Sequence, residues 1–209
     1  MKSALVMLSG GMDSATALTL AAKTHKTTAV FFDYGQAAAD FELTAARQVC
    51  RQIGVPLEVV DISGLKRFFL GITPEPVIAM GFRGGMHANC PHGLFGIAST
   101  YCVSAEIDLL VTGMQSDDTR GLIDVKGYLT NWAQGIRGLQ QTSFDFEFPL
   151  IDMSKTEVIA LGNQLNVPFE VTRSCSASTT THCGQCSACL ERKAAFQTAG
   201  IQDPTSYLA

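Results

Sequence analysis

The residues with the clearest capacity for chemistry form a glycine-rich loop at positions 9–14, with the sequence SGGMDS. The loop follows a short apolar run and precedes an alanine- and leucine-rich segment, so it should join a strand to a helix. Such a junction presents unsatisfied backbone N–H groups at the helix N-terminus, where the helix dipole favours anions. Gly10 and Gly11 let the backbone approach a ligand without a Cβ clash. The pattern predicts a phosphate-binding loop; the structural alternative is a glycine turn capped by Asp13 and Ser14.

The side chains of this loop divide into hydroxyl donors and one acid. Ser9 and Ser14 add hydroxyls to the backbone amides. Asp13 is negative and should not face a phosphate directly, so we assign it either to helix capping or to Mg²⁺. The loop is not a Walker A motif, because no Gly-Lys-Ser/Thr follows at the required distance. The expected nucleotide contacts are Ser9, Gly10, Gly11, Met12, Asp13 and Ser14.

A second cluster of reactive side chains lies near the C-terminus, where four of the seven cysteines gather at Cys175, Cys183, Cys186 and Cys189. Two Cys-x-x-Cys steps share Cys186, so successive thiolates can converge on one ion while Cys175 completes a tetrahedron. Four protein ligands saturate zinc, which predicts a structural Zn²⁺ site. An iron–sulfur cluster and free thiols remain alternatives, although the Pro that follows the last Cys of bacterial ferredoxin runs is absent. His182 could also replace one ligand.

The composition of the chain limits its partners and compartment. Its 209 residues carry a formal net charge of −4, which argues against nucleic-acid binding because phosphate neutralisation requires a basic surface. No stretch approaches the roughly 20 apolar residues of a membrane span, and the N-terminal apolar run is too short for a secretory signal. We therefore expect a cytoplasmic protein without a membrane partner, whose thiols stay reduced.

Apolar runs alternate with helical patterns at the spacing of βαβ units. Gly54 should end one helix, and Ser154 with Glu157 forms a capping box that opens another. Residues 63–91 are rich in Gly and Pro and should form a long irregular excursion. The alternation predicts an α/β fold with a parallel sheet and helices on both faces. The expected strands are 4–8, 28–33, 57–62, 108–112 and 143–148, and the expected helices include 14–23, 37–53, 92–106 and 125–138.

Five short strings together resemble one known family. The strings are SGGMDS at 9–14, YGQ at 34–36, PLIDMSK at 149–155, SC at 174–175 and CGQCSACLER at 183–192. They are similar to the 7-cyano-7-deazaguanine synthase (QueC) family of PP-loop ATP pyrophosphatases, and the similarity covers most of the chain. The resemblance implies a doubly wound α/β nucleotide-binding domain at residues 1–170, with a small zinc-binding segment at 171–209 packed on it. It also implies a homodimer.

The activity that this resemblance implies is an ATP-dependent carbon–nitrogen ligation. Members of the family cleave ATP between its α- and β-phosphates. The implied enzyme adenylates 7-carboxy-7-deazaguanine and uses ammonia to form the nitrile, with ATP, Mg²⁺ and Zn²⁺ as cofactors. Catalytic roles would fall on Asp13, Ser14 and Lys155, although Lys155 could instead be a surface charge. Further ATP contacts are implied for Tyr34, Gln36 and Gly113.

The middle of the chain departs from the family, because residues 83–92 and 113–121 replace the strings that members carry near the deazaguanine. We hypothesise that residues 83–92 and 115–120 line the acceptor pocket, with contacts from Arg83, His92, Asp117, Asp118 and Arg120. The two carboxylates can accept hydrogen bonds from a guanine-like amino edge; alternatively, both cap the next helix. The departures also leave other functions open: a paralogue that stops at the amide or conjugates a deazaguanine to an acceptor such as a protein amine, a tRNA-modifying enzyme, or a nucleotide sensor.

Overall fold

The computed structural model describes residues 1–66, 90–118 and 124–208, and for residues 90–92 the helical backbone alone. Five parallel strands form its sheet, in the order β3-β2-β1-β4-β5. Their bounds are β1 Ser3–Met7, β2 Lys26–Asp33, β3 Leu57–Asp61, β4 Leu109–Val111 and β5 Asp145–Glu147. The chain builds outward from β1 to β3, then returns to the other side of β1 with β4 and β5. The sheet is therefore doubly wound.

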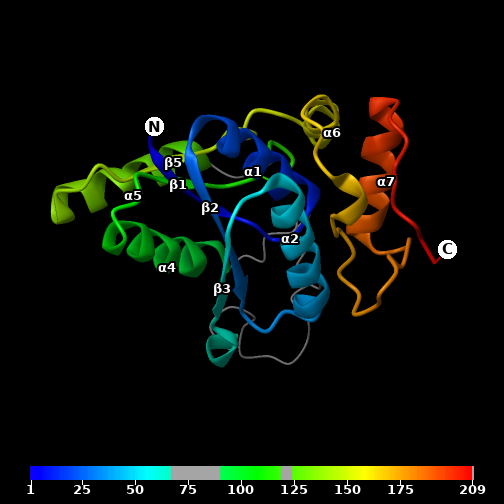
Figure 1. The fold of residues 1–209 in the computed structure, drawn as a ribbon, viewed down its shortest axis with the longest axis horizontal. Helices are drawn as coiled ribbons and strands as arrows, with labels where there is room; N and C mark the ends of the chain where they lie inside the picture. Colours follow the sequence, from blue (N-terminus) through cyan, green and yellow to red (C-terminus); the bar gives the residue numbers. More distant parts are fainter. Residues whose placement is uncertain (67–89, 119–123, 209) are drawn as a thin grey trace.

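Helices cover both faces of this sheet (Figure 1). One face carries α1 Met12–Thr24, α2 Ala39–Ile53, α6 Lys155–Gln164 and α7 Ser187–Ala199, and the other carries α4 Cys90–Ser104 and α5 Val125–Gln140. Among the residues that the structure describes, two short 3₁₀ turns, η1 Ser63–Leu65 and η3 Phe169–Val171, lie in the connections. The predicted α/β class, with a parallel sheet between two helical layers, is confirmed.

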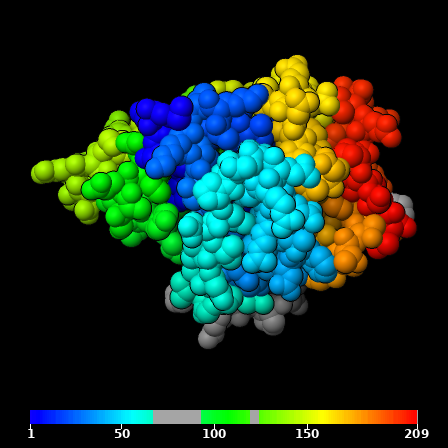
Figure 2. Space-filling view, in the orientation of Figure 1, coloured from blue at the N-terminus to red at the C-terminus, as the bar shows by residue number. Residues whose placement is uncertain are grey.

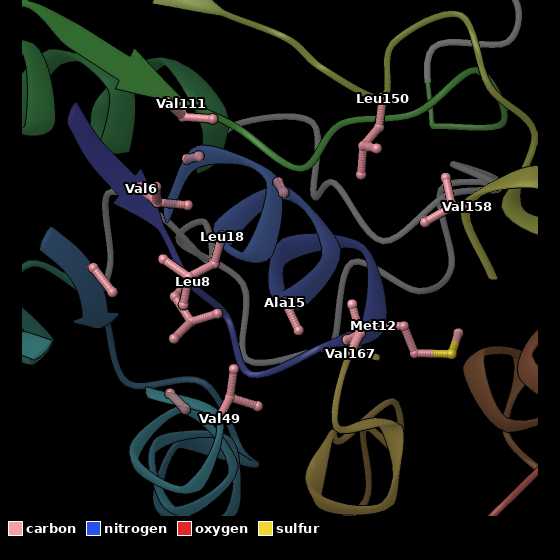
Figure 3. Packing of buried hydrophobic residues seen from close by; sticks show 14 of the residues in the cluster. Val6, Leu8, Met12, Ala15, Leu18, Val49, Val111, Leu150, Val158 and Val167 are labelled. Atoms are coloured by element: carbon pink, nitrogen blue, oxygen red, sulfur yellow. The ribbon is translucent and has the colours of Figure 1, made fainter. Parts of the chain in front are cut away.

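The two cores follow from the alternation of side chains along each strand. In β1, Ala4 and Val6 join the cluster beneath α1 and α2, while Leu5 points to the cluster beneath α4 and α5. Figure 3 shows the first cluster, where Val6 and Val111 gather with Leu18 of α1. Because both faces are buried at the centre of the sheet, β1 and β4 are nearly continuous apolar runs, whereas the edge strands β3 and β5 also carry charged residues and are partly exposed.

Several local expectations are confirmed and two need correction. Gly54 ends α2 in the left-handed region with φ 79°, and the capping box at the start of α6 is formed by both of its hydrogen bonds. The irregular excursion ends earlier than expected, because α4 begins at Cys90. The last strand is also shorter than residues 143–148: β5 pairs only with β4, over three residues, at the edge of the sheet. Because its neighbour β4 has only three residues, β5 can form no longer run of paired residues.

The C-terminal segment shares the core of the first face. The Phe196 ring of α7 packs edge-on against Phe169, with ring centroids 5.3 Å apart, and both belong to the cluster beneath α1. Figure 2 shows this segment, in orange and red, lying against α2. The division into a nucleotide-binding domain at residues 1–170 and a separate segment at 171–209 stays a prediction. Within the described residues, no helix combines the length and apolar character that crossing a membrane requires.

Candidate nucleotide and metal sites

The glycine loop lies where the sheet changes direction. β1 and β4 are neighbours, and the chain leaves β1 for a helix on one face while β4 leads toward a helix on the other. Ligands of doubly wound sheets bind at this switch point, beyond the carboxyl ends of the strands. The two chain segments are nearly in contact here, since a Cβ on Gly113 would lie 2.7 Å from Ser14 Cα. Glycine at position 113 therefore lets the end of β4 approach the start of α1.

Gly10 has both a conformational and a packing requirement. Its φ is +83°, which side chains other than glycine rarely adopt. A Cβ at this position would also lie 2.6 Å from the Glu42 carbonyl oxygen in α2. The Gly10 carbonyl accepts a 2.8 Å hydrogen bond from the backbone N–H of Arg173. The loop is thus held between α2 and the segment that precedes the cysteines.

The two serine hydroxyls of the loop bond within it. Ser14 Oγ donates to the Gly11 carbonyl over 3.1 Å and lies 3.1 Å from Ser9 Oγ. The Ser9 backbone N–H is 3.3 Å from Ser14 Oγ. These contacts set the curvature of the loop, and Ser14 is buried.

Helix α1 begins without a side-chain cap. Gly11 is its N-cap residue, and no described side chain bonds the amides of its first turn. The capping alternative for Asp13 and Ser14 is therefore wrong, because the Ser14 hydroxyl donates to the Gly11 carbonyl and Asp13 points elsewhere. By contrast, Ser154 caps α6. The first amides of α1 lack intrahelical acceptors by geometry, so they stay available to an anion.

Asp13 lies beside a lysine from a distant part of the chain. Its Oδ2 is 3.5 Å from Lys155 Nζ, while Oδ1 is buried and has no hydrogen-bond partner among the described residues. Burial raises the pKa of Asp13, and the attraction of Lys155 only partly opposes that rise. A buried carboxylate oxygen without a donor is costly in a protein. A divalent cation would satisfy this oxygen, so the donor set fits the Mg²⁺ expected from sequence.

Lys155 stands at the start of α6, between carboxylates. Its Nζ is 3.7 Å from Glu191 Oε2 as well as 3.5 Å from Asp13. Burial would lower the pKa of Lys155, but the negative charges of Asp13, Asp118 and Glu191 outweigh it and raise the pKa. With only a fifth of its side chain exposed, Lys155 is not a free surface charge. It is a fixed cation beside the glycine loop.

The adjacent aspartates 117 and 118 come close to the same cation. Asp117 Oδ2 accepts a 3.0 Å hydrogen bond from the backbone N–H of Lys155, and Asp118 Oδ2 accepts from Gln115 N–H over 3.2 Å. Burial first, and then the charge of Asp13, raise the pKa of Asp118 to about 6. Neither residue caps the next helix, whose cap is Asp124. The helix-capping alternative is therefore wrong. The loop after β4 turns back toward α6, and no local sequence pattern predicts that contact.

The turn after β2 forms a small hydrogen-bond network. Gln36 Oε1 accepts from the Tyr34 backbone N–H over 3.0 Å, while Gln36 Nε2 donates to the Phe32 carbonyl and to Glu42 Oε2. Gly35 has φ +84° and donates its N–H to Asp33 Oδ1. These bonds fix the Tyr34–Gln36 turn beside the start of α2.

The four cysteine sulfurs converge as the spacing predicted. All four Sγ atoms lie within 4.8 Å of one another, and Cys183 and Cys189 are 4.0 Å apart. Zn–S bonds of about 2.3 Å in a regular tetrahedron imply S···S separations of about 3.8 Å, so small movements would suffice. His182 lies outside this converging group, and its Nε2 accepts the Ser174 backbone N–H over 3.1 Å.

The surroundings of Cys183 and Cys186 favour the ligating thiolate form, whereas burial raises the pKa of Cys189 to about 12. Backbone N–H groups of Gln185 and Cys186 donate to Cys183 Sγ and lower the pKa of that thiol. Burial opposes ionisation of Cys186, yet donors from Ser176 and Cys189 outweigh it and bring its pKa to about 6. Because metal ligation requires thiolates, the site fits a bound cation such as Zn²⁺. Cys50 and Cys102, by contrast, are core residues whose pKa values burial raises to about 11 and about 12.

Three of the expected acceptor contacts fall outside the residues that the structure describes, and two residues near the site were not predicted from the sequence. Arg83 and Arg120 lie outside the described residues, as does the side chain of His92. Arg173 and Glu191, which contact the glycine loop and Lys155, were missed. Their only sequence signal was proximity to the cysteines, which does not indicate that the C-terminal segment folds back onto the loop.

Comparison with known proteins gives these sites a context. The sequence model of the family described as "Queuosine biosynthesis protein QueC" matches residues 3–73 and 91–200. This chain belongs to the QueC family. It is similar to the 7-cyano-7-deazaguanine synthase of Cupriavidus pinatubonensis, with 33% identity over 99% of this chain and 98% of that protein. The corresponding protein of Methanobrevibacter smithii is 27% identical over 99% of this chain and 98% of its own.

Among solved structures, the NMN synthetase of Francisella tularensis resembles this QueC-family chain in fold. The TM-score is 0.55 with 18% identity, over 96% of this chain and 78% of that one. The family match leaves out residues 74–90, which include most of the first string expected near the acceptor.

Proposed function

We propose that this QueC-family protein is an ATP-dependent ligase that converts 7-carboxy-7-deazaguanine and ammonia into 7-cyano-7-deazaguanine, releasing AMP and pyrophosphate. The observation that carries the proposal is the glycine loop at the β1/β4 switch point, with uncapped α1 amides beside Lys155 and the unpaired Asp13 Oδ1. The family match and the full-length similarity to 7-cyano-7-deazaguanine synthases support this assignment.

The chemistry accounts for the need for ATP. A carboxylate is a poor electrophile because its leaving group would be oxide, and transfer of AMP to that oxygen replaces the oxide with a good leaving group. Ammonia then attacks the carbonyl carbon, the C–O bond to AMP breaks, and the amide forms after loss of a proton. A second ATP activates the amide oxygen in the same way. Loss of that oxygen with AMP, and of two protons from nitrogen, leaves the nitrile.

The described residues would contribute mainly by position and charge. The α1 amides and Lys155 would hold the phosphates, while Asp13 would bind the Mg²⁺ that neutralises charge on the reacting phosphorus. Ser14 would keep the loop curved, since its hydroxyl bonds within it. The Tyr34–Gln36 turn and Gly113 would flank the rest of the nucleotide. The four cysteines would hold a structural Zn²⁺, because all coordination positions are filled by protein.

The acceptor half of the site carries a second candidate. Residues 74–90 lie outside the family match, and Asp117 already bonds the α6 backbone. Both observations favour a paralogue that stops at the amide or joins a deazaguanine to another amine. Of the two aspartates, Asp118 is the better candidate for a guanine-like edge, since the carboxylate of Asp117 is engaged by the α6 backbone, while that of Asp118 accepts from the nearby Gln115 amide within its own loop.

The decisive experiment is mass spectrometry of products from ATP, ammonium and 7-carboxy-7-deazaguanine. The nitrile with AMP and pyrophosphate is expected; amide as the end product would establish the second candidate, and ADP with orthophosphate would overturn both. Asp117→Asn and Asp118→Asn, made separately, test the acceptor contact. A paired, desolvated carboxylate is worth about 1.5–3 kcal/mol, so at least one variant should lose roughly tenfold to a hundredfold in acceptor affinity with ATP binding nearly unchanged.

A further inference from the structure

Arg173 is a buried arginine that none of the matched motifs assigns a role. It is only 7% exposed, and its Nε has no hydrogen-bond partner among the described residues. It stands two residues before the first candidate metal ligand, Cys175. Its backbone N–H donates to the Gly10 carbonyl of the glycine loop over 2.8 Å. The residue therefore joins the two sites that the sequence placed in separate segments.

The side chain of Arg173 extends this link to two more elements. Its guanidinium carbon lies 4.7 Å from the centre of the Phe41 ring in α2, a distance that suits a cation–π contact. Its NH2 group donates to the Ala177 carbonyl, inside the loop between Cys175 and Cys183. The guanidinium thus ties α2 to the cysteine-bearing loop, while the backbone of the same residue holds the glycine loop.

The charge of Arg173 also acts on the turn after β2. Burial raises the pKa of Glu42, and both its hydrogen bond from Gln36 and the positive charge of Arg173 counter that rise. Gln36 in turn orders the backbone of Tyr34. Loss of the Arg173 charge would leave Glu42 less favourably ionised and its bond to Gln36 weaker.

Other contacts run parallel to this one. Ser178, also between Cys175 and Cys183, donates its hydroxyl to the Ala37 carbonyl just before α2. Glu191, two residues after Cys189, contacts Lys155, which contacts Asp13. The segment before α2 and the side chain of Lys155 therefore both contact residues near the cysteines, which metal binding would order.

We propose that Arg173 is a positioning residue for the nucleotide, and that through it metal binding at the four cysteines and nucleotide binding at the glycine loop strengthen each other. The inference rests on the proposed use of ATP. The coupling is reciprocal by necessity: the factor by which zinc tightens the nucleotide equals the factor by which the nucleotide tightens zinc. Metal binding at the four cysteines would then affect nucleotide affinity as well as the stability of the fold.

The test compares zinc-loaded wild type with Arg173→Met, and with Arg137→Met as the matched control. Arg137 also donates to a backbone carbonyl and pairs with a carboxylate, but it lies on α5 across the sheet. The probe is α,β-methylene-ATP, whose α–β link the enzyme cannot cleave, measured by titration calorimetry. We expect Arg173→Met to bind it about tenfold more weakly at unchanged zinc content, to raise the KM for ATP, and to leave kcat within about twofold. Arg137→Met should match wild type.

The coupling itself is measured through zinc. Competition with a chromophoric chelator, with and without α,β-methylene-ATP, should show the nucleotide tightening zinc about fivefold or more in wild type, and not in Arg173→Met. If that variant does not fold, Phe41→Leu and Arg173→Lys carry the test, because each removes the stacked planar contact and keeps the side-chain volume close. Equal nucleotide affinity in the Arg173 and Arg137 variants, or zinc affinity indifferent to nucleotide, would overturn the inference. Wild type that binds no nucleotide would instead refute the proposed use of ATP.

Discussion

The arginine that closes the cysteine motif should be a major determinant of stability. Arg192 is fully buried, and its guanidinium donates to Asp203 Oδ1, Thr172 Oγ1 and the Phe169 carbonyl over 3.1, 2.8 and 3.0 Å. Arg192→Ala would remove a donor from three acceptors, of which Asp203 is charged and partly buried. The Phe169 carbonyl would keep the Thr172 hydroxyl as a donor and Asp203 Oδ1 would keep the Thr205 N–H, so the largest loss is the ion pair with Asp203. Hydrogen bonds to charged groups contribute about 1.5–3 kcal/mol each, and removal of one partner of a buried ion pair costs about 3–5 kcal/mol. Since the three bonds share one cavity, we expect a total of about 3–5 kcal/mol.

The assay is urea unfolding in excess zinc, followed both by circular dichroism and by fluorescence of Trp132, the single tryptophan of the chain. Trp132 lies on α5, across the sheet from Arg192, so coincident transitions would show that the whole chain unfolds together. For a chain of this size the expected loss lowers Tm by roughly 6–20 °C. Arg192→Lys should lose less, because it keeps the charge but cannot span all three acceptors. A loss below about 1 kcal/mol, or one no larger than that of the partly exposed Arg137→Ala, would refute this account of the motif.

Three further predictions concern the two sites. Asp13→Ala should abolish pyrophosphate release, because it removes the oxygens that face Lys155 and the proposed Mg²⁺; activity within a few-fold of wild type would exclude Asp13 from the site. Because burial raises the pKa of Asp118 to about 6, the folded chain holds that proton more tightly than the unfolded chain, so this group should lower the free energy of unfolding as pH rises from about 4 to 6. Asp118→Asn should remove that component, and identical pH profiles in urea unfolding would contradict it. The purified protein should hold one Zn²⁺ per chain, which Cys186→Ser should release, and stoichiometric iron in elemental analysis would show a cluster instead.

Local patterns were enough to predict the elements and the chemistry of each string. The central strands β1 and β4 are apolar runs because both sheet faces are buried there, and glycines or helical patterns follow them in the sequence. The four-cysteine cluster could also be predicted, since Cys-x-x-Cys spacing makes thiols from one short segment converge. The candidate nucleotide loop could be predicted for the same reason: all its expected donors lie within six consecutive residues.

Tertiary structure decided everything that joins distant segments. The packing of Gly113 against Ser14 depends on β4 returning beside β1, and the Lys155–Asp13 contact depends on α6 beginning at that same sheet edge. Asp117 bonds the backbone of Lys155 rather than capping the following helix, and Arg173 meets the glycine loop only because the cysteine segment folds back over it. Short-range patterns carry information about neighbours within a few residues, where backbone geometry limits the choices. Contacts across more than a hundred residues are selected by the burial of both sheet faces together, so only the folded chain assigns their partners.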